Sequence, residues 1–296
     1  AGRSLVPTLQ LTSLALGAQA LLRAGKPERA RIAALASGTA ILAPAWLEDA
    51  EAGRSPAPPT RAAAAGEALR IDGAKRFVQG FDAAAELLVP VCGPEGETRF
   101  VLVPRGAAGI AATAQRLASL DAVHDLSFTA VGVARERMLS LPWSAWLEVI
   151  DGAKIIAGAW SVGAARAALE MAVGYARDRK QFGRAIGSFQ AVQHRLADAA
   201  IALEQASAVV RYAAWLRAGG GDCAREAAMA KLVAGRAVRQ VTHAAALTHG
   251  GYGFMEEFDI QLYVRRAKQL DQLVEGPALQ RELIAAEESD DLLRVH

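Results

Sequence analysis

Apolar residues in the second half of the chain recur at three- and four-residue spacing, the signature of amphipathic helices. Gly-rich stretches interrupt this pattern, and Ser188 and Asp222 are positioned to cap the second and third helices. Pro277 is a favourable first-turn residue for the last one. Long helices joined by short turns predict an antiparallel four-helix bundle. The expected helices cover residues 155–176, 189–213, 222–249, 260–270 and 277–284.

The middle of the chain has a different pattern, with short apolar runs separated by turn residues. Asp72-Gly73 and residues 93–97 are typical of hairpin turns. This region is therefore expected to form a small antiparallel β domain. The expected strands cover residues 69–71, 75–78, 87–91, 100–103 and 126–133.

Residues 1–43 return to a helical pattern. The uncharged stretch from Ser4 to Leu22 superficially resembles an export signal, but polar residues and Pro7 interrupt it. A buried helix is therefore expected, and neither export nor a membrane span. Because the chain starts without Met and inside a helical pattern, further residues are expected upstream. The predicted fold is α+β and multidomain: an N-terminal helical remnant (1–43), a middle β domain (44–150) and a C-terminal helical bundle domain (151–296).

Composition narrows the functional classes. With 52% hydrophobic and 22% charged residues, the 296-residue chain is typical of an ordinary folded protein, long enough for more than one core. The net charge is only +2 and the basic residues are scattered, which argues against nucleic acid as a partner. Cys92 and Cys223 are far apart and the five histidines lack metal-ligand spacing. We therefore expect no disulfide framework and no metal site, in a reducing cytoplasm.

Four short motifs follow one another along the predicted bundle, while Walker and GxSxG motifs are absent. Each motif alone is weak evidence, because a surface arginine or a core phenylalanine would fit it equally well. The motifs are Arg179-x-Gln181-Phe182-Gly183, Phe189-Gln190, Gly250-Gly251-Tyr252-Gly253 and Glu275-Gly276. In this order, downstream of the segment LRIDGAKRFVQG (69–80), they resemble the acyl-CoA dehydrogenase family over nearly the whole chain.

This resemblance implies a helical domain, a β domain and a four-helix bundle, with FAD at a subunit interface of a dimer of dimers. Glu275 matches the glutamate of the family's Y-E-G-T motif, which removes the α proton of a bound acyl-CoA while the β hydride passes to the flavin. Such a base needs a dry site that raises its pKa. Asp151, close to where a few relatives carry the base on the first bundle helix, is the weaker alternative.

The family's contacts to a subunit's own FAD are degraded in this sequence. The loop expected around Ala45 to Thr60 is not recognisable, and Phe77-Val78-Gln79 replaces a Trp-Ile-Thr strand. The Tyr, Thr and Gln of Y-E-G-T-x-Q are replaced by apolar residues, which removes hydroxyl and amide hydrogen bonds. These residues are Val274, Pro277 and Leu279.

The contacts that the family makes to a neighbouring subunit's FAD are largely kept. By the resemblance, Arg179 suits the pyrophosphate, Phe182 the adenine, and Gly251, beside Gly250, a close backbone approach. Gln181 is also the residue that the family prefers at its position. Leu247, four residues before Gly251, stands where the family usually has an amide side chain.

The asymmetry between lost and kept contacts indicates the flavin-poor subunit of a heteromeric acyl-CoA dehydrogenase. We expect a heterotetramer with a homologous subunit, FAD shared across the interface, and an electron-transfer flavoprotein as acceptor. Glu275 is then either the working base or a relic. The substrate is an acyl-CoA, and a bulky one from steroid side-chain β-oxidation is compatible with the sequence. A homomeric dehydrogenase with altered flavin contacts and a non-catalytic scaffold are the two alternatives.

Overall fold

The computed structural model describes residues 2–5, 9–25, 28–48, 57–66 and 68–294. By their contacts they form two compact units, one of Ala1–Pro7 with Asp151–His296 and the other of Thr8–Ile150. The expected division into three domains stays a prediction. The fold class, with helices at the N-terminus, a sheet in the middle and helices at the C-terminus, is confirmed.

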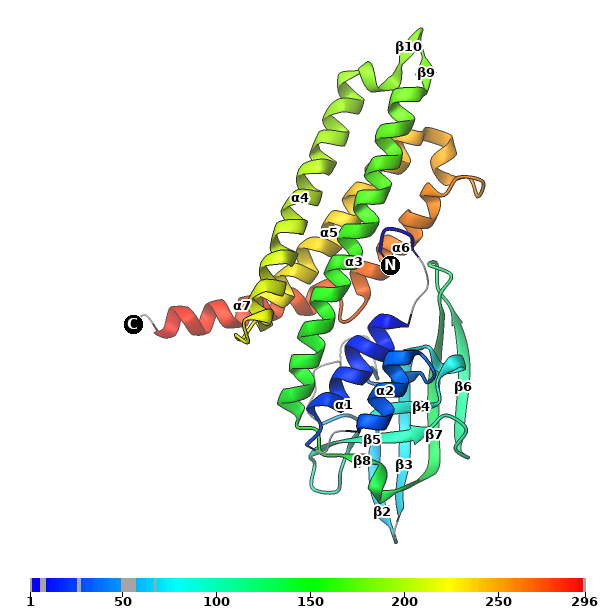
Figure 1. Ribbon diagram of the computed structural model, residues 1–296, viewed down its shortest axis with the longest axis vertical. Coiled ribbons are helices and arrows are strands. Elements are labelled where there is room, and N and C mark those ends of the chain that lie inside the picture. Colours follow the sequence, from blue (N-terminus) through cyan, green and yellow to red (C-terminus); the bar gives the residue numbers. More distant parts are fainter. Residues whose placement is uncertain (1, 6–8, 26–27, 49–56, 67, 295–296) are drawn as a thin grey trace. The chain divides into compact units, whose positions relative to one another are not determined.

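One eight-stranded sheet forms the core of the Thr8–Ile150 unit (Figure 1). The strand order is β6-β7-β3-β2-β4-β5-β8, with β1 beside β4. Pairing is antiparallel except at the short β1–β4 and β2–β4 contacts. Alternate residues such as Ile71, Val89 and Val131 point into a common apolar core. The strands are β1 (Leu42–Pro44), β2 (Arg61–Ala65), β3 (Ala68–Gln79), β4 (Glu86–Cys92), β5 (Thr98–Pro104), β6 (Ile110–Arg116), β7 (Ala122–Ala134) and β8 (Met138–Leu139).

The expected hairpin turn at Asp72-Gly73 is wrong, because β3 runs straight through it as one strand. A register shift against β7 lies between Ile71 and Gly73, so the dipeptide forms a β-bulge. The Asp72 carboxylate accepts a hydrogen bond from the Ala130 backbone N–H of β7 at 2.7 Å. The expected turn at residues 93–97 does join β4 to β5.

Before the sheet, the chain forms a π-helix (Gln10–Ala18) and helices α1 (Gln19–Arg23) and α2 (Arg29–Ser37). The buried helix expected from Ser4 to Leu22 is thus seen from Gln10 onward, with Leu11, Leu16 and Leu21 buried. Residues 6–8 of that stretch lie outside the described residues. Within the described ranges, none of the helices combines the length and apolar character needed to cross a bilayer.

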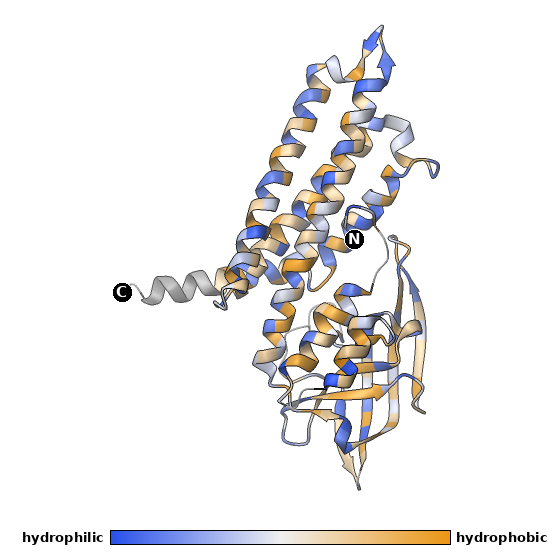
Figure 2. Ribbon diagram, viewed as in Figure 1, coloured by the Kyte–Doolittle hydropathy of each residue, from blue (hydrophilic) through white to orange (hydrophobic). Residues whose placement is uncertain are grey.

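The C-terminal helices match the predicted pattern closely, although the first one starts at Trp143, well before the expected residue 155. Small residues such as Ala206, Ala213 and Ala230 line their contacts and let the helices approach closely. Figure 2 shows apolar and polar residues alternating around these helices, as amphipathic packing requires. The helices are α3 (Trp143–Asp178), α4 (Gln190–Ala218), α5 (Ala224–His249), α6 (Ile260–Gln272) and α7 (Pro277–Arg294).

The two predicted helix caps differ in outcome. The Ser188 hydroxyl donates to the Ala185 carbonyl at 2.7 Å within a 3-10 turn, so it does not cap α4. Phe189 is the residue before α4 and makes no side-chain cap. The Asp222 carboxylate accepts from the Ala224 N–H, the first residue of α5, at 3.2 Å, which partly fulfils its expected role.

Candidate functional site

Glu275, the candidate base, lies in the turn between α6 and α7. Its backbone φ is +78° and that of Val274 is +56°, so both residues are left-handed although neither is glycine. The Glu275 side chain is only 1% exposed, and its Oε2 lies 2.9 Å from the Nζ of Lys154. Glu275 is therefore a buried, ion-paired carboxylate.

Lys154 also forms an ion pair with Asp151, the second candidate base. The side chain of Lys154 is fully buried on α3, one turn after Asp151, and its Nζ lies 3.1 Å from the Asp151 Oδ1. Neither carboxylate was linked to a lysine by the sequence analysis. We call Asp151, Lys154 and Glu275 the Lys154 cluster. It brings together two acids that are distant in sequence, on one cation.

Buried polar groups from α5, α6 and α7 surround the cluster. The Gln280 amide of α7 donates to Glu275 Oε2 at 3.4 Å. From α5, Lys231 donates to the backbone carbonyls of Leu270 (3.0 Å) and Asp271 (2.8 Å), at the end of α6. Burial lowers the pKa of the Lys231 ammonium to about 8, although the negative charges of Asp271 and Glu275 oppose the shift. Four elements thus meet at a network of buried charges.

The predicted flavin-contacting residues gather at the other end of α3. A short hairpin of β9 (Lys180–Gln181) and β10 (Arg184–Ala185) follows α3, with Phe182 and Gly183 as its turn. Phe182 has φ +55° and is 91% exposed, with an edge contact to Phe189. An exposed aromatic residue in a left-handed turn contributes little to folding and is free to contact a ligand or partner.

Arg179 and the glycine turn after α5 lie together. The Arg179 guanidinium stands 5.7 Å from the ring of Tyr252, inside the turn Gly250–Phe254. Gly250 is left-handed, and a Cβ on Gly253 would meet the Ala246 carbonyl at 2.3 Å, so both have structural reasons to be glycine. A Cβ on Gly251 would meet nothing within 4 Å. This chain's own packing therefore gives no reason for glycine at 251.

Glu275 and the Arg179 end belong to different places in the bundle. Lys154 lies near the start of α3 and Asp178 is its last residue. At 1.5 Å per residue, the helix separates them by roughly 35 Å. The structure thus brings Arg179 together with Gly250 and Gly251, and keeps Glu275 apart from them.

The strand expected to carry the chain's own flavin contacts is committed to internal bonds. Gln79 accepts a hydrogen bond from the Thr12 hydroxyl at 3.2 Å, and Val78 is buried. The Phe77 N–H donates to the Asp125 carboxylate at 3.0 Å. Residues 49–56, half of the loop from Ala45 to Thr60 whose flavin contacts the sequence no longer shows, lie outside the described residues.

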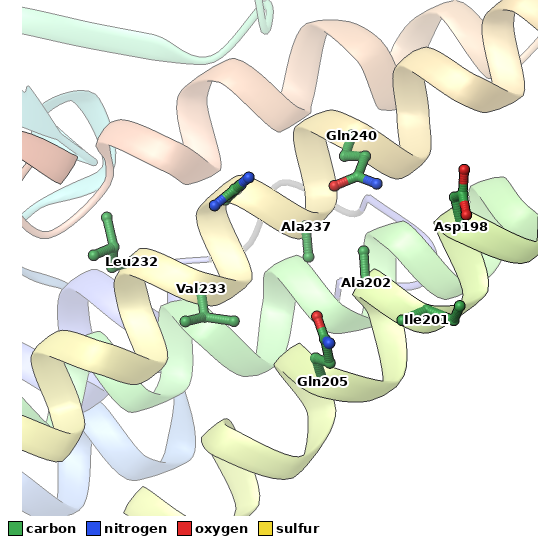
Figure 3. A pocket seen from close by; sticks show the side chains of 9 residues that line it. Asp198, Ile201, Ala202, Gln205, Leu232, Val233, Ala237 and Gln240 are labelled. Atoms are coloured by element: carbon green, nitrogen blue, oxygen red, sulfur yellow. The ribbon is translucent and has the colours of Figure 1, made fainter. Parts of the chain in front are cut away.

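An open groove runs between α4 and α5, with polar and apolar side chains from both helices on its walls (Figure 3). It contains none of the predicted site residues, so it is not a candidate for the chemistry. Its lining includes Asp198, Ile201, Gln205, Val233, Arg236 and Gln240.

The sequence analysis missed Lys154, Lys231 and Gln280. A signal existed for the lysines: the chain has only six, and three of them, including Lys75 of the sheet, are buried. Lysine is almost never fully buried without a partner. A lysine inside an otherwise apolar helical stripe therefore indicates a buried acid, although not which one.

Comparisons with known proteins agree with this architecture. Residues 143–288 match the family model "Acyl-CoA dehydrogenase, C-terminal domain". Acyl-CoA dehydrogenase FadE27 of Mycobacterium tuberculosis is 32% identical over 298 residues, covering 97% of this chain and 78% of that protein.

Two solved structures are similar throughout. One is the ChsE4-ChsE5 complex from Mycobacterium tuberculosis, with a TM-score of 0.88 and 30% identity over 97% of this chain and 78% of that one. The other is a variant of the Tcur3481-Tcur3483 steroid ACAD, with a TM-score of 0.88 and 29% identity. The match covers 99% of this chain and 79% of that one. The chain belongs to the acyl-CoA dehydrogenase family of FAD-binding oxidoreductases, which act on a CH–CH bond of acyl-CoA.

Proposed function

We propose that this chain is the flavin-poor subunit of a heteromeric acyl-CoA dehydrogenase that forms 2-enoyl-CoA. The observation that carries the proposal is Phe182, which stands 91% exposed in a left-handed turn three residues after Arg179, whose guanidinium lies over Tyr252 in the glycine turn. This end of the bundle is built to contact something outside the chain.

The residues present fit one half of a flavin site. Arg179 would hold the pyrophosphate of FAD by forked hydrogen bonds, Phe182 would stack on the adenine, and Gln181, Gly250 and Gly251 would line the approach. When bound, FAD supplies the acceptor for the substrate's β hydride. The strand that should hold the chain's own flavin does not fit, because Gln79 is bonded to Thr12 and Phe77 to Asp125. A shared site needs the second half from a partner.

A homologous subunit is the partner that the comparisons support. The similar ChsE4-ChsE5 structure is a complex of two proteins. One face of α4 also carries exposed apolar side chains, Ile201, Tyr212 and Trp215, the last two stacked at 6.0 Å. Such a face suits a subunit contact. A tetramer with two copies of each chain, with an electron-transfer flavoprotein as its electron acceptor, is part of this proposal.

The substrate class is inferred from a neighbour. The Tcur3481-Tcur3483 protein is a steroid ACAD. This supports, as the substrate of this chain too, an acyl-CoA whose acyl group is the side chain of a bulky steroid. A cytoplasmic location completes the proposal, because Cys92 and Cys223 are both buried and form no disulfide.

A homomeric dehydrogenase is the second candidate, because Glu275 is present at the motif position of the base. A non-catalytic scaffold with the same fold is the third.

Co-expression separates these candidates. The chain is purified alone and together with its co-encoded homologue, and the visible absorbance of flavin is recorded for each. Flavin in the co-purified sample alone is the expected result. A yellow lone chain that oxidises acyl-CoA would favour the homomeric enzyme, and a colourless complex would favour the scaffold.

A further inference from the structure

We propose that Lys154 fixes Glu275 as an ion-paired structural carboxylate, so that Glu275 does not take the α proton of the substrate in this chain. The inference rests on the proposed function, because a heteromer has a partner subunit that can supply the base.

The reaction sets the requirement that Glu275 fails to meet. Dehydrogenation breaks two C–H bonds: the α hydrogen leaves as a proton to a base, and the β hydrogen leaves with its electron pair as a hydride to FAD. The base must therefore be able to accept a proton inside a dry site. At 2.9 Å, the Lys154 ammonium attracts the negative charge of Glu275, and this attraction is lost whenever Glu275 takes up a proton.

The geometry also ties Glu275 down. Its Oε2 accepts from both Lys154 and the Gln280 amide, and both donors are fully buried. Moving the carboxylate toward a substrate would break its bonds to both buried donors, which is unfavourable although Lys154 keeps Asp151.

The backbone of the same turn is held in place by its surroundings. Val274 and Glu275 are both left-handed, a conformation that β-branched residues such as valine rarely adopt. Strain of this kind persists only where surrounding contacts over-determine the conformation. The bond from Lys154 on α3 to Glu275 supplies such a contact and fixes the path of the chain from α6 to α7.

The surrounding charges are balanced without any acid being set aside for chemistry. Lys154 is shared with Asp151 at 3.1 Å, half-exposed Arg239 pairs with Asp271 at 3.1 Å, and Lys231 donates to the carbonyls of Leu270 and Asp271. Among the described residues, three cations and three carboxylates thus meet at α3, α5, α6 and the turn before α7. Such a network holds its members in place.

A double-mutant cycle tests the pair in the purified complex and in the lone chain. The variants are Lys154→Met, Glu275→Gln and the double variant. Lys154→Met removes the buried ammonium that both carboxylates share and should lower the thermal midpoint by about 10 °C. Glu275→Gln should lower it less, because Lys154 keeps Asp151, and the double variant should recover part of the loss.

A matched control completes the cycle. Lys75→Met, which removes a buried lysine paired with Glu48 in the other unit, is the matched control. Its effect should simply add to that of Glu275→Gln.

Turnover of the flavin-loaded complex decides the catalytic question. With octanoyl-CoA and the CoA thioester of a steroid side-chain acid as probes, Glu275→Gln should stay within about twofold of wild type. A loss of about 10²-fold with flavin still bound would identify Glu275 as the base and overturn the inference. Single variants whose effects merely add would overturn it as well. If the lone wild-type chain binds flavin and oxidises a thioester, the proposed function fails instead.

Discussion

Phe182 combines a left-handed backbone with almost complete exposure, which folding alone does not require. Asparagine tolerates this conformation better, so Phe182→Asn should leave the free energy of unfolding unchanged or raise it by up to about 1 kcal/mol. Loss of the aromatic face should weaken flavin retention by the complex by about tenfold. Leu120→Asn is the matched control, since Leu120 is also left-handed and 70% exposed, in the other unit. Equal flavin retention in both variants would contradict the role given to Phe182.

Lys231 makes stability depend on pH in a predictable direction. Its pKa is lowered to about 8 in the folded state, so the unfolded chain binds more protons between about pH 8 and 10.5. The free energy of unfolding should therefore rise with pH in this window, by at most about 3 kcal/mol from this group. Denaturant titrations should show a shallower rise for Lys231→Met. Some slope should remain, because the pKa of Lys75 is also lowered to about 8 by burial. Identical slopes would refute this assignment.

The sequence was informative about individual site residues only where a motif marked them. Arg179, Gln181, Phe182, Gly250 and Gly251 were found in this way, and their functional roles stay predictions. Lys154 was missed because its partner Glu275 is far away in the sequence, and the contact exists only once α3 and the turn before α7 pack together.

At the scale of elements, helices were predicted better than strands. The spacing of the apolar residues predicted helices at the positions of α3 to α7. The β-bulge in β3, in contrast, depends on a hydrogen bond from the Ala130 N–H of β7 to Asp72, a long-range contact that the local sequence does not reveal. Strand β6 was missed because its Ala-rich residues are largely exposed and show little alternation. Tertiary pairing, rather than local preference, decides these cases.

Gly73 makes the bulge possible. A Cβ at this position would lie 2.7 Å from the Cα of buried Thr60, and the backbone φ is +149°. Gly73→Ala should therefore destabilise the Thr8–Ile150 unit by about 2 kcal/mol. Gly132→Ala on β7, where a Cβ meets nothing within 4 Å, should change the free energy of unfolding by less than about 0.5 kcal/mol. Chemical denaturation of both variants checks the difference, and equal effects would rule out the steric explanation.

At the scale of the whole molecule, the chain carries two sets of candidate site residues that differ in burial. The Lys154 cluster is buried and sets two carboxylates against one ammonium, while Phe182 and Arg179 at the other end of α3 are exposed. A buried, ion-paired acid and an exposed end that we propose to be half of a flavin site are what a supporting subunit would have. The central claim is therefore that this chain completes a partner's flavin site and lacks a complete one of its own.

The ratio of bound flavin to polypeptide in the co-purified complex tests this claim most directly. After denaturation, the released FAD is measured by its absorbance and the two chains are quantified separately. We predict one flavin for each pair of chains, and none with the lone chain. One flavin for every chain, or flavin retained by this chain alone, would contradict the account.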